Sequence, residues 1–175
     1  QILYAVAIGS SSTDTARAIK VDATGNLYVL ASTFGTDFPV TSAVTPTYPI
    51  GSFLFKLNPT GTALTYSAQL GSRTNALAFD IDSAGAAYIS GSANALDIPT
   101  TPGVIKPSPA AGQNDYYGFI IKLAPAGNTF QIATYYGSLG QTVEAISVRS
   151  NGILISASGT LALLNNTLTQ QTASA

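Results

Sequence analysis

Few side chains in this 175-residue chain can do chemistry, because it contains no His, Cys, Met or Trp. Without them the usual zinc sites, Ser-His-Asp triads, Cys nucleophiles and haem ligands are excluded. What remains is carboxylates: Asp37 and Asp97 each stand two residues before a proline. A pair of carboxylates lining one channel can act as general acid and base or bind Ca²⁺. The alternative is a turn-capping role, and we expect no catalytic residue, no metal ligand and no cofactor.

A second group of candidates lies in a long insertion, where Asn114, Asp115, Tyr116 and Tyr117 are adjacent. Amide and carboxylate groups hydrogen-bond to hydroxyls, and aromatic faces stack on sugar rings. The favoured interpretation is nevertheless a loop whose tyrosines cover the edge of a blade. A carbohydrate-binding loop formed by these four residues is the alternative.

The chain consists of internal repeats. Residues 18–32 match residues 78–92 at an offset of 60, and residues 55–61 match 121–127 at an offset of 66. A third, degenerate copy starts at Ala145. We predict one domain with repeats at about 11–72, 73–138 and 139–175. Recurring acids such as Asp37 and Asp97 favour a structural role, because a catalytic residue has no reason to recur in every unit.

Each repeat contains two strand–turn–strand patterns and no helical periodicity. Short apolar runs flank an Asp-x-x-Gly turn in the first hairpin and an Asn/Ala-Pro-x-Gly turn in the second. The predicted structural turn residues are Asp22, Gly25, Asn58, Pro59, Gly61, Asp82, Gly85, Pro125 and Gly127. The fold class is therefore all-β, a β-propeller-type array of about three four-stranded antiparallel blades.

The N-terminal residues 3–10 match residues 65–72, the end of repeat 1. We therefore predict residues 1–10 to be the outer strand of a shared blade. Residues 2–8 would complete a blade near the C-terminus, within one chain or by donation to a second copy. Three blades are few for a ring, whereas two chains would supply six.

The pattern Ala-Ile-x-Val-Asp-x-x-Gly-Asn-x-Tyr-Val, then Asp-Phe-Pro, Lys-Leu-Asn-Pro-x-Gly and Leu-x-Tyr-Ser, resembles the bacterial β-propeller repeat of the SBBP type. The first two copies carry the resemblance throughout, and the third only in its first half. The resemblance implies a propeller fold in large proteins outside the cytoplasm. It implies no catalytic residues.

Charge and hydropathy limit the classes of function that this chain could have. A net charge of −1 without a basic cluster argues against nucleic-acid binding, and no apolar run approaches the roughly 18 residues of a membrane span. Low charge with abundant Ser, Thr, Ala, Asn and Gly is typical of secreted bacterial proteins. We predict an extracellular structural or interaction module whose partner is itself, through residues 2–8, or another extracellular protein. The alternatives are glycan binding and, third, a glycoside hydrolase using Asp37, Asp97 or Asp115.

Overall fold

The computed structural model describes residues 1–41, 50–109, 115–169 and 171–174. Twelve β-strands make up the fold, and no helix is present in the described residues. The strands are β1 (Asp14–Val21), β2 (Leu27–Thr33), β3 (Gly51–Leu57), β4 (Leu64–Gln69), β5 (Asn75–Ile81), β6 (Ala87–Asn94), β7 (Tyr116–Leu123), β8 (Phe130–Tyr136), β9 (Val143–Arg149), β10 (Gly152–Ala157), β11 (Thr160–Leu164) and β12 (Gln171–Ser174).

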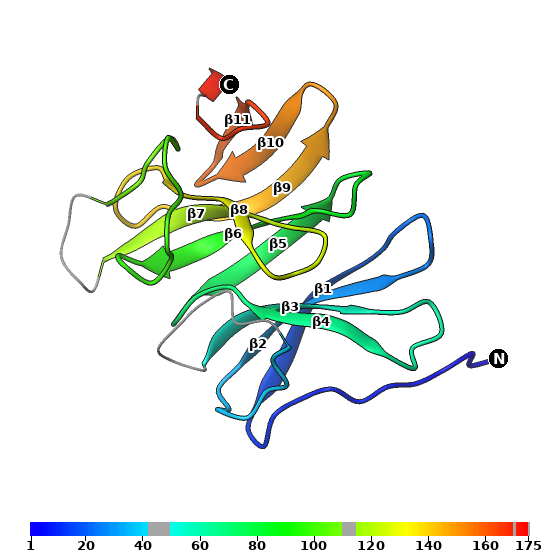
Figure 1. Cartoon of the computed structure of the whole chain (residues 1–175). Helices are drawn as coiled ribbons and strands as arrows, with labels where there is room; N and C mark the ends of the chain where they lie inside the picture. The colour runs from blue at the N-terminus through cyan, green and yellow to red at the C-terminus, as the bar shows by residue number, and fades with distance from the viewer. Residues whose placement is uncertain (42–49, 110–114, 170, 175) are drawn as a thin grey trace.

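The strands form three four-stranded antiparallel sheets, each built from four consecutive strands in chain order. We call them sheet 1 (β1–β4), sheet 2 (β5–β8) and sheet 3 (β9–β12), and Figure 1 shows them following one another through the molecule. The predicted all-β class is confirmed, as is the division into three antiparallel units. Within the described residues the three sheets do not close into a ring.

The first hairpin of sheets 1 and 2 turns at the predicted Asp and Gly. The N–H of Gly25 donates to the carbonyl of Asp22, and Gly85 does the same to Asp82. Both glycines have φ near +84°, in the left-handed region where a side chain is strained. This explains why the two turns share their sequence pattern.

Apolar side chains cover both faces of the sheets, because successive residues of a strand point to opposite sides. In β3, Leu54 faces sheet 2, whereas Phe53 and Phe55 belong to a cluster on the outer face of sheet 1. One core cluster joins sheets 1 and 2, and a second joins sheets 2 and 3. The sheets are thus packed face to face in series.

The first strand of sheet 2 and the first strand of sheet 3 lie against the preceding sheet. β5 contacts β1 and β2, and β9 contacts β5 and β6. Each of these first strands carries a β-bulge, which increases local twist. This regular relation is compatible with the predicted propeller arrangement, which stays a prediction.

One of the two predicted positions of residues 1–10 was the outer strand of sheet 3 in the same chain, and the structure does not show them there. Residues 1–10 belong to no strand and run as an extended segment along the outer face of sheet 1 (Figure 1). The fourth strand of sheet 3 is β12, which pairs with β11. Residues 2–8 therefore do not complete sheet 3 in this chain, because β12 already holds that edge; donation to a second copy stays a prediction. None of the described residues forms a helix long and apolar enough to cross a membrane.

Candidate functional site

A lysine joins a tyrosine and an aspartate at the turn end of sheet 1. Nζ of Lys56 lies 2.7 Å from the hydroxyl of Tyr28 and 3.5 Å from Oδ2 of Asp22. The turn holds the carboxylate in place, since the N–H groups of Thr24 and Asn26 donate to Asp22 Oδ1 at 3.0 and 2.9 Å. The arrangement combines a cation, a phenol and a carboxylate, which is a set of groups able to transfer protons.

The electrostatics of Asp22 argue against proton transfer. Burial opposes ionisation of this carboxyl group, but hydrogen bonds from Asn26 and Thr24 outweigh burial and hold its pKa well below its usual range. A general acid needs a pKa near the working pH. Asp22 is therefore a fixed negative charge that anchors the turn.

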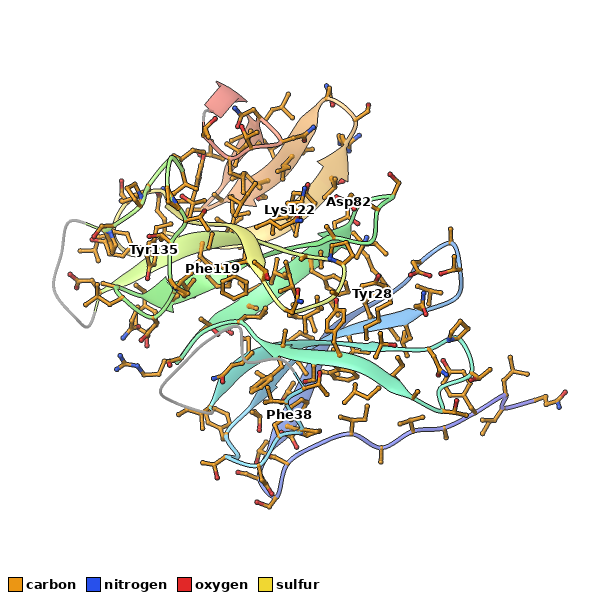
Figure 2. All side chains as sticks on the ribbon, in the orientation of Figure 1. Tyr28, Phe38, Asp82, Phe119, Lys122 and Tyr135 are labelled. Carbon is orange, nitrogen blue, oxygen red and sulfur yellow. The ribbon has the colours of Figure 1, made fainter. Side chains whose placement is uncertain are left out.

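The same cluster recurs in sheet 2, where Lys122 Nζ lies 3.7 Å from Asp82 Oδ2 and 4.9 Å from the ring centre of Tyr88. Figure 2 shows Lys122 and Asp82 at the sheet 2 turn and Tyr28 at the junction with sheet 1. The matching positions of sheet 3 hold Arg149, Leu154 and Leu163. Recurrence in consecutive repeats identifies the cluster as part of the architecture.

The clusters act at the junctions between sheets. The hydroxyl of Tyr28 lies 3.4 Å from the carbonyl oxygen of Gly85, in the turn of the next sheet. A cavity of about 420 Å³ lies between the two turns, lined by Asp22, Lys56 and Asp82 among others. The sheet 1 cluster thus connects its own turn to the turn of sheet 2, and Tyr88 of the sheet 2 cluster belongs to the core cluster that joins sheets 2 and 3.

Asp80 makes a connection that the sequence analysis missed. Its Oδ1 lies 2.7 Å from Nζ of Lys20 in sheet 1, and its Oδ2 accepts a hydrogen bond from the N–H of Val148 in sheet 3 at 2.8 Å. One side chain of sheet 2 therefore contacts both neighbouring sheets. The signal was present, because Lys20 and Asp80 are opposite charges at equivalent repeat positions on neighbouring strands.

The predicted carboxylates Asp37 and Asp97 have different surroundings. Asp37 is exposed and accepts hydrogen bonds from the N–H of Ser11 at 2.9 Å and from its hydroxyl at 3.1 Å. The backbone bond from Ser11 keeps the pKa of Asp37 low. Asp97 is buried; burial raises its pKa, although Arg73 Nη2, at 3.0 Å, opposes the rise.

Asp37 has one carboxylate neighbour, Asp14, whose charge acts on it. Asp14 in turn accepts hydrogen bonds from Ser10, and its pKa is lowered as well, first of all by the Thr33 hydroxyl. A glycoside hydrolase needs one carboxyl group with a raised pKa as the acid. The Asp14–Asp37 pair, with both pKa values lowered, does not fit that requirement.

The two tyrosines of the predicted carbohydrate-binding loop differ in exposure. Asn114 lies outside the described residues, and Asp115 precedes β7. Tyr117 is buried, lies edge-on to Tyr135 with ring centres 6.3 Å apart, and carries Lys106 over its ring at 4.6 Å. Tyr116, in contrast, is half exposed. Of the two tyrosines, only Tyr116 can meet a ligand at the surface.

Glu144 lies in β9, the first strand of sheet 3. Glu144 accepts the N–H of Ser158 at 2.9 Å, which is a capping role. Among the described residues no group of three acidic side chains is close enough to hold a metal ion.

The N-terminal segment packs on sheet 1 in the way that sheet 1 packs on sheet 2. The ring of Tyr66 in β4 lies so close over Gly127 that a Cβ there would overlap it. The ring of Tyr4 lies over Gly61 in the same manner, and Gly61 is the repeat equivalent of Gly127. Residues 3–8 therefore lie where the fourth strand of a preceding sheet would lie.

The outer side of this segment is uncovered. Ile2 and Leu3 are 82% and 88% exposed, whereas Ile8 packs on the outer cluster of sheet 1. Val6 is 46% exposed, although its repeat equivalent Ala68 is fully buried. The segment thus has the packing of a strand on one side and no paired strand beside it in the described chain.

Comparisons with known proteins do not show a family for this chain. No family model matches the chain, and no curated protein matches it significantly. The resemblance to SBBP-type repeats stays a prediction.

Proposed function

We propose that this chain is an extracellular structural module, built from propeller-type blades, that joins a second copy of itself blade to blade. The observation that carries the proposal is the placement of residues 3–8 on sheet 1. Tyr4 repeats on Gly61 the contact that Tyr66 makes on Gly127. A segment in the position of a fourth strand needs a third strand to pair with.

The repeats specify which strand of the second copy would pair with it. In sheet 1, Ala68 of β4 pairs with Leu54 of β3. Val6 stands in the position of Ala68. Leu161 in β11 stands in the position of Leu54, because it pairs with Ser156 as Leu54 pairs with Leu30. The expected register therefore places Val6 of one copy opposite Leu161 of the partner subunit.

Exposure agrees with this pairing. Leu161 is 52% exposed, whereas its equivalent in sheet 2, Ile120, is fully buried between sheets. Pairing would cover Leu161 and Val6 together, and burial of apolar area stabilises an interface. Two copies joined at both ends would place six blades in a ring, within the four to eight of known propellers. Strand β12 gives way to the incoming segment in this arrangement.

The chain contains no cysteine, so a disulfide between two introduced cysteines reports directly on the register of the proposed pairing. Chains carrying Val6→Cys are mixed with chains carrying Leu161→Cys under mild oxidation. Directly paired positions lie about 5 Å apart, within the reach of a disulfide, so we expect a covalent dimer.

The register control is Leu3→Cys mixed with Leu161→Cys, which is offset by three residues or about 10 Å and should not cross-link. Equal cross-linking by both mixtures, or by neither, contradicts the proposal. Removing residues 171–175, the competing edge strand, should leave the cross-link unchanged or strengthen it.

A further inference from the structure

A groove lies at the junction of sheets 1 and 2, at the end opposite the lysine clusters. It encloses about 510 Å³, within the range of roughly 300–1,000 Å³ found for small-molecule sites. β1 supplies Arg17, β5 supplies Asn75, and the loop between β4 and β5 supplies Arg73. Two aromatic side chains, Phe34 and Tyr116, line it as well.

The charge of the groove is one-sided. Arg17 and Arg73 are among its lining residues and no carboxylate is, in a chain whose net charge is −1. Asp97 lies behind Arg73 and anchors it at 3.0 Å, with the carboxylate side chain 7% exposed and the guanidinium side chain 51% exposed. A buried carboxylate thus holds a surface guanidinium in a fixed position.

Backbone geometry supports a special role for Arg73. Arg73 has φ +49°, a conformation that costs a non-glycine residue free energy and is concentrated at functional sites. Arg17 is the bulged residue of β1, between Ala16 and Ala18, which pair with β2. The bulge recurs in β5 and β9, so it belongs to the repeat architecture, and the arginine at this position is what distinguishes β1.

The repeats separate this groove from the architecture. The equivalents of Arg17, Arg73 and Tyr116 in the neighbouring repeat are Leu77, Thr13 and Ile50. The lysine clusters at the other end of the junction recur, whereas these residues do not. The blade fold therefore does not require them, and their chemistry is specific to one junction.

The residue types match one ligand chemistry. Guanidinium groups bind carboxylates through paired, charge-assisted hydrogen bonds. Exposed aromatic rings, here Tyr116 and Phe34, pack on the C–H faces of sugar rings, and Asn75 and Ser92 can hydrogen-bond hydroxyls. We propose that this groove binds a uronic acid unit of an acidic polysaccharide, its carboxylate at Arg17 and Arg73 and its ring against Tyr116.

The test is calorimetric titration of the full chain with trigalacturonate, trimannuronate and a hyaluronan tetrasaccharide, each alongside its methyl ester. At least one acid should bind, and its ester should bind at least tenfold more weakly. Arg17→Leu, which introduces the residue of the equivalent position 77, should weaken binding at least tenfold without loss of folding. Tyr116→Ile, which introduces the residue of position 50, should weaken it several-fold.

Arg149→Leu is the matched control, because it removes the same charge from an exposed position outside the groove, and binding should stay within twofold. Three results overturn the proposal: no saturable binding of any of the acids, equal binding of acid and ester, or equal losses in the two arginine variants. A Val6→Asp variant, in which self-association is blocked, should bind the acid unchanged. The groove and the blade pairing are thereby tested separately.

Discussion

β4 and the N-terminal residues 3–8 carry the same sequence pattern in two different environments. β4 pairs with β3 along its edge and is buried between sheets 1 and 2, and its Tyr66 is 2% exposed. Residues 3–8 have sheet 1 on one side and no paired strand, and Tyr4 is 40% exposed. The difference shows that this pattern becomes a strand where a neighbouring edge supplies backbone hydrogen bonds. The same residues without that edge form an extended segment.

Introducing a charge at matched positions is expected to separate the two environments most strongly. Ala68→Asp places a carboxylate in a fully buried position without a partner, which costs about 3–5 kcal/mol and should unfold much of the protein. Val6→Asp changes a half-exposed position, so the single chain should keep its stability within about 0.5 kcal/mol. Urea unfolding followed by circular dichroism measures both.

Gel filtration of the Val6→Asp variant adds the second half of this test. The folded variant should elute as a monomer, because the charge would lie opposite Leu161 of the partner subunit. A Val6→Asp variant that still elutes as a dimer would show that residues 3–8 are not part of the interface.

Removing the equivalent tyrosine rings is the next largest comparison. Tyr66→Ala should cost about 3–4 kcal/mol, as for other buried aromatic residues, because it leaves a cavity between sheets 1 and 2. Tyr4→Ala should cost less than about 1 kcal/mol in dilute solution, where the segment is held on one side only. Urea midpoints at low protein concentration compare the two, and equal losses would show that the N-terminal segment is as firmly held as β4.

The pH dependence of stability contrasts two carboxylates of the same junction. Burial opposes ionisation of Asp22, but hydrogen bonds outweigh burial and hold its pKa below its usual range. The contribution of Asp22 to the stability of the fold is therefore present above the unfolded pKa near 3.8 and is lost as pH falls through the folded pKa. Asp22→Asn should therefore flatten the decline in stability below pH 4. Thermal melts between pH 2 and pH 8 measure the decline, and an unchanged acid slope would contradict the anchoring role.

Asp97 should behave in the opposite sense, because burial raises its pKa. The contribution of Asp97 to the stability of the fold is largest at low pH and decreases as pH rises through the folded pKa. Asp97→Asn should remove that decrease, and the same melts would show it. A steeper loss at neutral pH in this variant would contradict the assignment.

The smallest expected effect concerns the hydroxyl of Tyr66, which is buried and has no hydrogen-bond partner among the described residues. Such an unpaired group costs free energy, so Tyr66→Phe should raise stability by up to about 1 kcal/mol. Tyr28→Phe is the matched variant, and it should lower stability because it removes the bond to Lys56. A loss of stability in both variants would show that the Tyr66 hydroxyl has a hydrogen-bond partner.

The sheets could be predicted from the repeats because turn chemistry is local. Gly25 and Gly85 require a left-handed backbone, and the alternating residues between turns are sufficient to place strands. The N-terminal segment could not be assigned in the same way. Its pattern matches that of β4, but pairing depends on an edge that the segment's own sequence does not specify.

The candidate site residues could be predicted only in part, for a similar reason. Tyr116 and Tyr117 were expected to act together in a loop, but both lie in β7, where neighbouring side chains point to opposite faces. The groove residues Arg17 and Arg73 were not predicted, because they are far apart in sequence and match no motif. Their departure from the repeat, against Leu77 and Thr13, was the one available indication.

The most direct test of blade pairing is the mass in solution, measured by light scattering coupled to gel filtration at about 100 µM and about 1 µM protein. Blade pairing predicts a mass of about twice the 17.9 kDa of the chain at the higher concentration. It also predicts a monomer for a chain lacking residues 1–8 and a dimer for a chain lacking residues 171–175. A full-length chain that stays at 17.9 kDa at the higher concentration would contradict the proposed pairing.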